Sequence, residues 1–143
     1  MKTKSKELFL LLCILIVGSL FRFYNLNWDQ NAHLHPDERF LTMVGNGLKL
    51  PSNFWDFMNP EKSTFNPANA GFNFFVYGIF PVTLNKTIAM VINNDNYNDF
   101  TLQGRFLSAL ADFFVVILIF KIVHLFERKY SLDSSIKYFA AFL

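Results

Sequence analysis

The residues best suited to chemistry lie in one short stretch, His33-Leu-His35-Pro36-Asp37-Glu38-Arg39-Phe40. Two adjacent carboxylates on a helix face different directions, because successive side chains are about 100° apart. One of them can therefore point into a cavity as a general base, while the other pairs with a cation such as Arg39 or bonds to the backbone. The structural alternative is an ordinary helix start, because Asp37 and Glu38 would also stabilise the positive end of a helix.

His33 and His35 are candidate metal ligands, because imidazoles beside carboxylates bind zinc or manganese. Two residues apart, they share a side only on an extended strand, and no third ligand stands at a metal-site spacing. The one cysteine, Cys13, lies within an apolar run, so the chain offers no thiolate cluster and no intrachain disulfide. We expect no metal and no cofactor, with the two histidines as weak candidates.

The segments that must position these residues are typical of a membrane protein. Of the 143 residues, 52% are hydrophobic and only 17% are charged, which is too apolar for a soluble domain of this length. A net charge of +2 is too small for a surface that binds nucleic acid through its phosphates. We therefore expect the lipid bilayer, and no nucleic acid, as a partner.

Two segments are predicted to cross the bilayer. The first, residues 8–28, joins the apolar run 8–21 to RFYNLNW, whose aromatic residues suit the membrane surface. A cleaved signal peptide is the alternative for this segment. The second, residues 105–126, has 21 residues from Phe106 onward, or roughly 31 Å of helix.

A third apolar run, residues 136–143, opens at Ile136 and stops at the last residue. We therefore interpret the chain as the amino-terminal fragment of a longer polytopic protein. The expected fold is an all-α membrane protein, a fragment of a helical bundle with two transmembrane helices, the start of a third, and an outward-facing loop layer that contains amphipathic helices.

The basic residues predict the orientation of these spans. Lysines precede the first span and basic residues follow the second: Lys2, Lys4, Lys6, Arg128, Lys129 and Lys137. Cytoplasmic flanks carry such an excess, so residues 1–7 and 127–135 are predicted to be cytoplasmic and residues 29–104 extracytoplasmic. The expected location is a multi-pass protein of the cell (inner) membrane.

Within the outer loop, a helix is predicted to begin at Pro36 and to place Phe40, Leu41, Val44 and Leu48 on one face, with Gly45 and Gly47 loosening or ending it.

Residues 72–92 have the length of a further span, but they include residues that are costly in hydrocarbon: Asn73, Pro81, Asn85 and Lys86. We predict that residues 72–92 lie in the membrane interface with their aromatic face toward the lipid.

Arg22 and Asp112 form a second candidate pair. Each lies six residues from the outer end of its predicted span, or roughly 9 Å deep, so antiparallel neighbours would bring them level. A buried ion pair is one explanation, and a role in a substrate cavity is the other.

Four stretches occur in an order typical of one enzyme superfamily: Leu20-Phe-Arg22-Phe-Tyr-Asn-Leu26, His35-Pro-Asp37-Glu38-Arg-Phe40, Phe74-Phe-Val-Tyr77-Gly78-Ile-Phe-Pro81 and Gly104-Arg105-Phe-Leu-Ser108-Ala-Leu-Ala-Asp112. With them the chain resembles the glycosyltransferase C superfamily. More narrowly, it is similar to the bacterial relatives of the dolichyl-phosphate-mannose protein mannosyltransferases, whose first outer loop opens with an Asp-Glu motif.

The resemblance implies an inverting transfer of a sugar from a polyprenyl-phosphate donor to a hydroxyl acceptor on the extracytoplasmic face, the acceptor being a glycolipid, a glycan or a protein. Asp37 would be the general base and Glu38 would orient it or the acceptor. Arg105 would hold the loop or an anionic donor group, and Arg39 and Tyr77 would contact substrate. Many members of the superfamily need no metal.

The chain departs from the eukaryotic enzymes in having Tyr77-Gly78-Ile-Phe-Pro81 where they have a His-Pro-Pro stretch. This favours a bacterial envelope or lipid acceptor over a protein. The fragment alone is expected to be inactive, because the later loops that bind the donor phosphate follow the second span. The alternative functions are a small membrane-anchored interaction protein and a transporter fragment whose Arg22 and Asp112 line a path through the bilayer.

Overall fold

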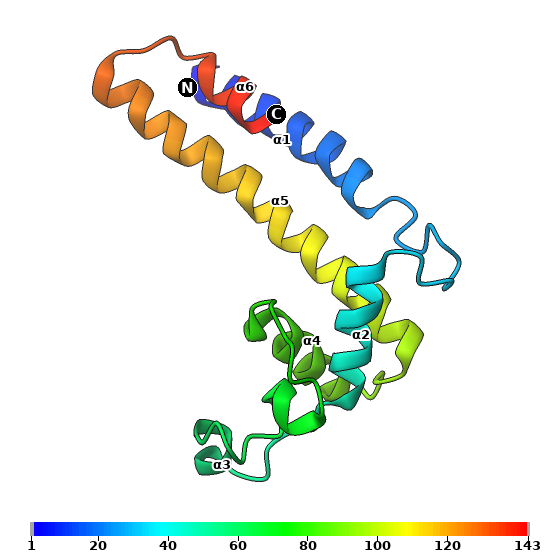
Figure 1. Ribbon diagram of the computed structural model, residues 1–143. Helices are drawn as coiled ribbons and strands as arrows, with labels where there is room; N and C mark the ends of the chain where they lie inside the picture. Colours follow the sequence, from blue (N-terminus) through cyan, green and yellow to red (C-terminus); the bar gives the residue numbers. More distant parts are fainter. Residues whose placement is uncertain (1, 143) are drawn as a thin grey trace. The chain divides into compact units, whose positions relative to one another are not determined.

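The computed structural model describes residues 2–142, with side chains from residue 5, and all of its regular structure there is helical (Figure 1). The helices in chain order are α1 (Lys2–Phe23), α2 (Pro36–Gly47), α3 (Phe54–Met58), the 3-10 helix η1 (Pro67–Ala70), α4 (Ile79–Val91), α5 (Tyr97–Tyr130) and α6 (Ile136–Phe142). The predicted all-α class is therefore confirmed for the described residues.

The chain forms two compact units. Unit 1 contains Met1–Leu26 and Ser108–Leu143, and unit 2 contains residues 27–107. The long helix α5 begins in unit 2 and continues through unit 1. The whole of the predicted outer loop, residues 29–104, therefore lies within unit 2.

Only α5, among the described helices, is long and apolar enough to cross a membrane. It begins at Tyr97, eight residues before the predicted span 105–126, and it ends at Tyr130. The predicted first span, residues 8–28, is helical only as far as Phe23, and its apolar run of fourteen residues is bounded by Glu7 and Arg22. The predicted carboxyl end lies five residues too late because a turn follows α1, with Asn25 in the left-handed region (φ 50°).

In unit 1, α1 and α6 pack together, and polar contacts join them to α5. The buried Lys137 of α6 places its Nζ 3.0 Å from Glu127 Oε2 of α5 and 3.2 Å from Glu7 Oε1 of α1. The helix α6 begins at Ile136, where the third apolar run was predicted to open. One lysine thus contacts all three helices of this unit.

In unit 2, α2, α4 and the start of α5 enclose a small apolar core. Its fully buried members are Val44, Leu48, Phe65, Val82, Ala89 and Phe100. The helix α2 begins at Pro36 and ends at Gly47, as predicted, and both Val44 and the C-cap residue Leu48 belong to this core. Of the predicted interfacial segment 72–92, only residues 79–91 are helical.

Gly45 allows α2 and α5 to approach closely. A Cβ added at this position would lie 2.1 Å from Cζ and 2.4 Å from Cε1 of Phe100. Such distances are far below van der Waals contact, so any larger residue must displace the Phe100 ring or separate the helices.

We expect Gly45→Ala to lower the free energy of unfolding by about 1–3 kcal/mol, because it overfills the core. The sign of the change in the free energy of unfolding is informative, since a change from Gly to Ala inside an unobstructed helix raises that free energy by about 1 kcal/mol. The measurement is thermal unfolding of the purified protein in detergent. Gly78→Ala is the control, because its Cβ would meet nothing nearer than Pro81 Cδ at 3.9 Å. An unchanged or higher Tm for Gly45→Ala would contradict the close packing.

Candidate functional site

The two adjacent carboxylates lie in the first turn of α2. His35 is the N-cap residue, and its Nδ1 accepts a hydrogen bond from the backbone N–H of Glu38 at 3.4 Å. Pro36 occupies the first helical position, where no backbone N–H is needed. Asp37 and Glu38 follow at the positive end of the helix dipole, where acidic side chains stabilise the helix. The local sequence therefore explains why this turn forms and why it holds acids.

Arg105 of α5 binds two carboxylates, one of them in this turn. Its Nε and Nη2 donate to Oε1 and Oε2 of Glu38, both at 2.6 Å. Its Nη1 and Nη2 donate to Oδ1 and Oδ2 of Asp29 at 3.0 and 2.8 Å. Both contacts are bidentate, the geometry in which a guanidinium binds a carboxylate most strongly. We call Arg105, Asp29 and Glu38 the Arg105 network.

The Arg105 network is largely shielded from water. The side chains of Arg105, Asp29 and Glu38 are 9%, 1% and 25% exposed. The Arg105 guanidinium also lies over the ring of Trp28, 5.4 Å from its centroid. Hydrogen bonding to Arg105 holds the pKa of Asp29 well below its usual range. Of the two roles expected for Arg105, this geometry fits the one in which it holds the loop.

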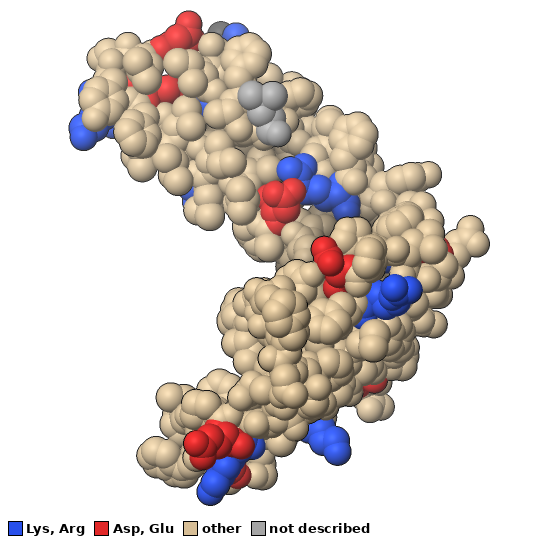
Figure 2. All heavy atoms as spheres, in the orientation of Figure 1, with Lys and Arg blue, Asp and Glu red and all other residues tan. Residues whose placement is uncertain are grey.

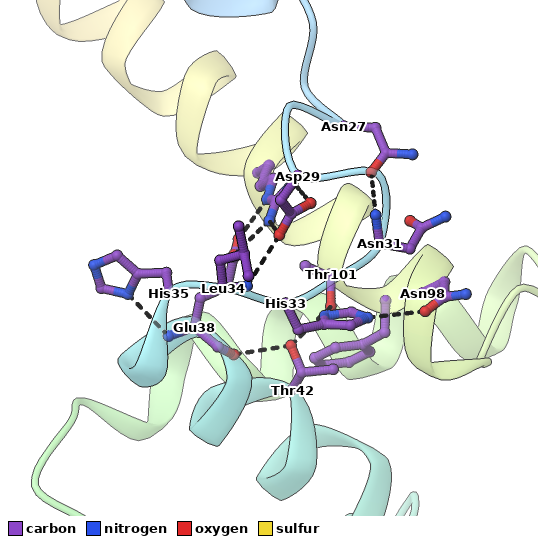
Figure 3. A network of polar contacts seen from close by, with 12 residues as sticks. Asn27, Asp29, Asn31, His33, Leu34, His35, Glu38, Thr42, Asn98 and Thr101 are labelled. Atoms are coloured by element: carbon purple, nitrogen blue, oxygen red, sulfur yellow. Dashed lines mark hydrogen bonds and ion pairs between the residues drawn. The ribbon is translucent and has the colours of Figure 1, made fainter.

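His33 connects the same loop to α5 from inside unit 2, where the loop passes between α2 and α5 (Figure 3). Its ring is buried, with Nε2 2.8 Å from Asn98 Oδ1 and Nδ1 3.3 Å from Thr101 Oγ1. The Thr101 hydroxyl lies 2.9 Å from that of Thr42, which in turn donates to the Glu38 carbonyl. Both ring nitrogens therefore have polar partners within the protein.

The histidine geometry offers no shared metal site. His33 is buried against α5, whereas the exposed His35 caps α2. Across the described residues, no group of three His, Cys, Asp or Glu side chains could hold an ion. These two residues therefore position the loop and the helix in this structure.

Asp37 differs from Glu38 in that none of the described cations pairs with it. Its side chain is exposed and, within the described part of the chain, forms no ion pair. It faces Tyr77, and hydrogen bonding to the Asp37 carboxylate raises the pKa of the Tyr77 hydroxyl above its usual value. The Tyr77 ring lies 6.2 Å from that of Phe40 and 5.9 Å from that of Phe75, measured between centroids. The α2 turn thus leaves one carboxylate accessible beside a phenol.

Arg39 was a candidate cation for these carboxylates, and the structure corrects that assignment. Its side chain is exposed, and none of the described carboxylates pairs with it. Its backbone carbonyl accepts a hydrogen bond from the Tyr97 hydroxyl at 3.3 Å. The cation that binds Glu38 is instead Arg105, 67 residues away in sequence.

Arg22 and Asp112 both belong to unit 1. Arg22 Nε donates to Asp112 Oδ2, which joins α1 to α5, and Arg22 Nη1 donates to the Gly18 carbonyl at 3.2 Å. Arg22 also borders a cavity of about 160 Å³ whose other walls are mainly apolar. Arg22 and Asp112 were predicted to meet because they lie at equal depth in the two predicted spans, and the structure shows that they are in contact.

Asp29 and the His33 contacts were missed by sequence reasoning. Asp29 directly follows Trp28 at the start of the predicted loop, but its partner is 76 residues away. The only sequence signal for the His33 contacts was the spacing of Asn98 and Thr101. These two polar residues are three positions apart, so they lie on the same face of a helix.

Comparison of the chain with protein-family models, with curated proteins and with solved structures finds no match.

Replacing Arg105 tests the network. We expect Arg105→Lys to lower the Tm by about 5 °C or more, because an ammonium cannot make two bidentate contacts and leaves shielded carboxylate oxygens unpaired. Arg39→Lys, the same change at an exposed arginine without an ion pair, should leave the Tm unchanged. Equal effects of the two substitutions on thermal unfolding in detergent would contradict the network.

The lowered pKa of Asp29 predicts how the stability of the fold depends on pH. Because its pKa is lower in the folded protein than in the unfolded chain, it stabilises the fold at neutral pH and loses this effect as the pH falls through its depressed pKa. The Tm of the wild type should exceed that of Asp29→Asn by a constant amount from about pH 7 to about pH 5, and by less in stronger acid. If the difference in Tm between the wild type and Asp29→Asn grew as the pH fell, the pKa of Asp29 would not be lowered by folding.

Proposed function

We propose that this protein is a membrane glycosyltransferase that transfers a sugar from a polyprenyl-phosphate donor to a hydroxyl acceptor at the extracytoplasmic face. The observation that carries the proposal is the contrast between the adjacent acids of α2: Glu38 is bound by Arg105, while Asp37 is accessible and faces Tyr77. Supporting it are the Asp-Glu motif and its resemblance to the glycosyltransferase C superfamily.

In the proposed reaction, an Asp37 oxygen accepts the proton of the acceptor hydroxyl as that oxygen attacks the anomeric carbon. The new carbon–oxygen bond forms as the bond from that carbon to the phosphate oxygen breaks, and the lipid phosphate leaves with the electron pair. The proton then passes from Asp37 to solvent. A single displacement of this kind inverts the anomeric centre, and a positioned base contributes about 10²- to 10⁴-fold in rate.

The other residues of the site have supporting roles in this proposal. Glu38, bound to Arg105, fixes the first turn of α2 and thereby the direction of Asp37. Tyr77 keeps its proton at neutral pH and can donate it in a hydrogen bond to Asp37 or to the acceptor. Arg39 is an exposed cation beside the base and is the candidate contact for the donor phosphate.

The proposed topology is multi-pass in the cell membrane. The helices α1 and α5 would cross the bilayer and residues 136–143 would belong to a third span, with the amino terminus cytoplasmic and unit 2 outside. The excess of basic residues at the proposed cytoplasmic flanks supports this orientation. The Arg22–Asp112 ion pair supports α1 as a neighbour of the long helix, since two charges in contact lower the cost of an apolar environment.

Asp37→Asn tests the proposed base. Membranes containing the full-length gene product would be given radiolabelled undecaprenyl-phosphate mannose or undecaprenyl-phosphate glucose, and label in the acceptor fraction would be counted. We expect Asp37→Asn to reduce transfer about 10²-fold or more, because the amide cannot accept the proton. Glu61→Gln is the control, as a change of an exposed acid elsewhere in unit 2.

Equal transfer by wild type and Asp37→Asn would exclude Asp37 as the base. Retention at the anomeric carbon would exclude the single displacement. Correct membrane insertion without transfer from either donor by the wild type would favour the membrane-anchored interaction protein.

A further inference from the structure

Three aromatic rings form a cluster next to the exposed acid Asp37 in unit 2. Phe40 belongs to the second turn of α2, whereas Phe75 and Tyr77 belong to the non-helical segment that precedes α4. The Tyr77 centroid lies 6.2 Å from that of Phe40 and 5.9 Å from that of Phe75, and the Phe40 and Phe75 centroids are 6.3 Å apart. Each ring therefore packs against the other two.

The two phenylalanines and Asp37 hold the Tyr77 ring in place. Phe40 and Phe75 are partly buried and pack against the apolar core of unit 2. The Tyr77 hydroxyl is hydrogen-bonded to the Asp37 carboxylate, and this contact raises the pKa of the hydroxyl. The Tyr77 side chain is itself only partly buried, so part of its surface is accessible. A ring fixed in this way loses little conformational entropy when a ligand packs against it.

An aromatic ring in contact with a carboxylate matches the two kinds of surface that a sugar presents. The face of an aromatic ring is electrically negative and attracts C–H groups, which a pyranose carries on its own faces. A carboxylate accepts several hydrogen bonds, and the hydroxyls at the rim of a pyranose are donors. Tyr77 and Asp37 can therefore bind one sugar ring together, with the hydroxyl that is to be glycosylated beside the base.

The surroundings of Tyr77 and Asp37 are polar and charged rather than apolar. His35, Asp37 and Arg39 are all exposed at the start of α2. On the face drawn in Figure 2, acidic and basic side chains gather near the start of α2. Covering these side chains with a hydrocarbon chain would remove their water without replacing its hydrogen bonds, which is costly. Sugar hydroxyls replace those hydrogen bonds, so a carbohydrate fits this surface better than the chain of a lipid.

We propose that the acceptor is a sugar whose pyranose ring packs on Tyr77 while one of its hydroxyls meets the Asp37 carboxylate. Tyr77 then selects the acceptor, and Phe40 and Phe75 support its ring. The inference rests on the proposed function, in which Asp37 takes the proton of that hydroxyl. It narrows the acceptor to a carbohydrate, either a free glycan or the headgroup of a glycolipid, and sets aside a serine or threonine hydroxyl of a protein.

Binding of simple sugars tests this inference without any transfer. The full-length gene product would be purified in lauryldimethylamine oxide, a detergent without sugar groups, and mixed with the methyl glycosides of glucose, galactose and mannose. Saturation-transfer difference NMR measures which ligand protons contact the protein, and its dependence on ligand concentration gives the dissociation constant. We expect the ring C–H protons of at least one of the three glycosides to be saturated.

Variants at two neighbouring aromatic positions identify the ring that binds the sugar. We expect Tyr77→Leu to raise the dissociation constant about five- to tenfold, because it removes the aromatic face, whereas Tyr77→Phe keeps the ring and should bind nearly as the wild type does. Phe74→Leu is the matched control, because Phe74 is 81% exposed and is not one of the three clustered rings. Circular dichroism would check that each variant keeps the wild-type helix content. Binding of none of the glycosides, or equal binding by the wild type and Tyr77→Leu, would overturn the proposal.

The chemistry of the acceptor fraction is a second test. Membranes that lack the gene supply this fraction, which would be treated either with periodate, to cleave the vicinal diols of sugars, or with proteinase K. It would then be given to the wild-type protein with labelled undecaprenyl-phosphate mannose or undecaprenyl-phosphate glucose. We expect periodate to abolish transfer and proteinase K to leave it unchanged, and the opposite pattern would show a protein acceptor. Partition of the label between chloroform–methanol and water distinguishes a glycolipid from a glycan.

The two experiments separate this inference from the proposed function. Sugar binding that depends on Tyr77, without transfer to the untreated fraction, would contradict the glycosyltransferase and leave the sugar site in place. Transfer that survives periodate, without binding of any glycoside, would leave the glycosyltransferase in place and overturn the sugar acceptor.

Discussion

The structure of unit 2 depends on the guanidinium of Arg105, which lies between the carboxylates of Asp29 and Glu38. Three segments meet there: the loop after α1, the first turn of α2 and the start of the long helix α5. A charge this well shielded is stable only with partners, and leaving one carboxylate without its cation would be costly. One bidentate contact therefore joins α2 to α5, and the other joins the preceding loop to the same helix.

The same network explains why two neighbouring acids have different environments. Glu38 is bound by Arg105 of α5, whereas Asp37 is exposed and its carboxylate raises the pKa of the Tyr77 hydroxyl. A base needs a carboxylate that is accessible and correctly aimed. In this arrangement the paired acid fixes the helix turn, and the neighbouring exposed acid is the one that we propose as the base. The His33–Thr101–Thr42 contacts support that turn from the interior.

Local sequence signals predicted the α2 helix well, because its start depends on residues that are adjacent in the chain: a proline at the first position and two acids behind it. The carboxyl end of α1 was placed five residues too late, because hydropathy alone does not register the turn that follows Phe23, in which Asn25 is left-handed. The partners of Glu38 and His33 could not be predicted, since Arg105, Asn98 and Thr101 lie more than 60 residues away. His33 in particular was considered as a metal ligand because its type suggests one, whereas its burial and its contacts are properties of the tertiary fold.

A double-mutant cycle between Glu38 and Arg105 tests the central claim most directly. The free energy of unfolding would be measured for the wild type, for Glu38→Gln, for Arg105→Gln and for the double variant. If Arg105 binds Glu38 as described, the double variant is less destabilised than the sum of the single variants, with a coupling of about 1–3 kcal/mol. Additive effects, with a coupling near zero, would mean that the two residues do not interact and would contradict the account.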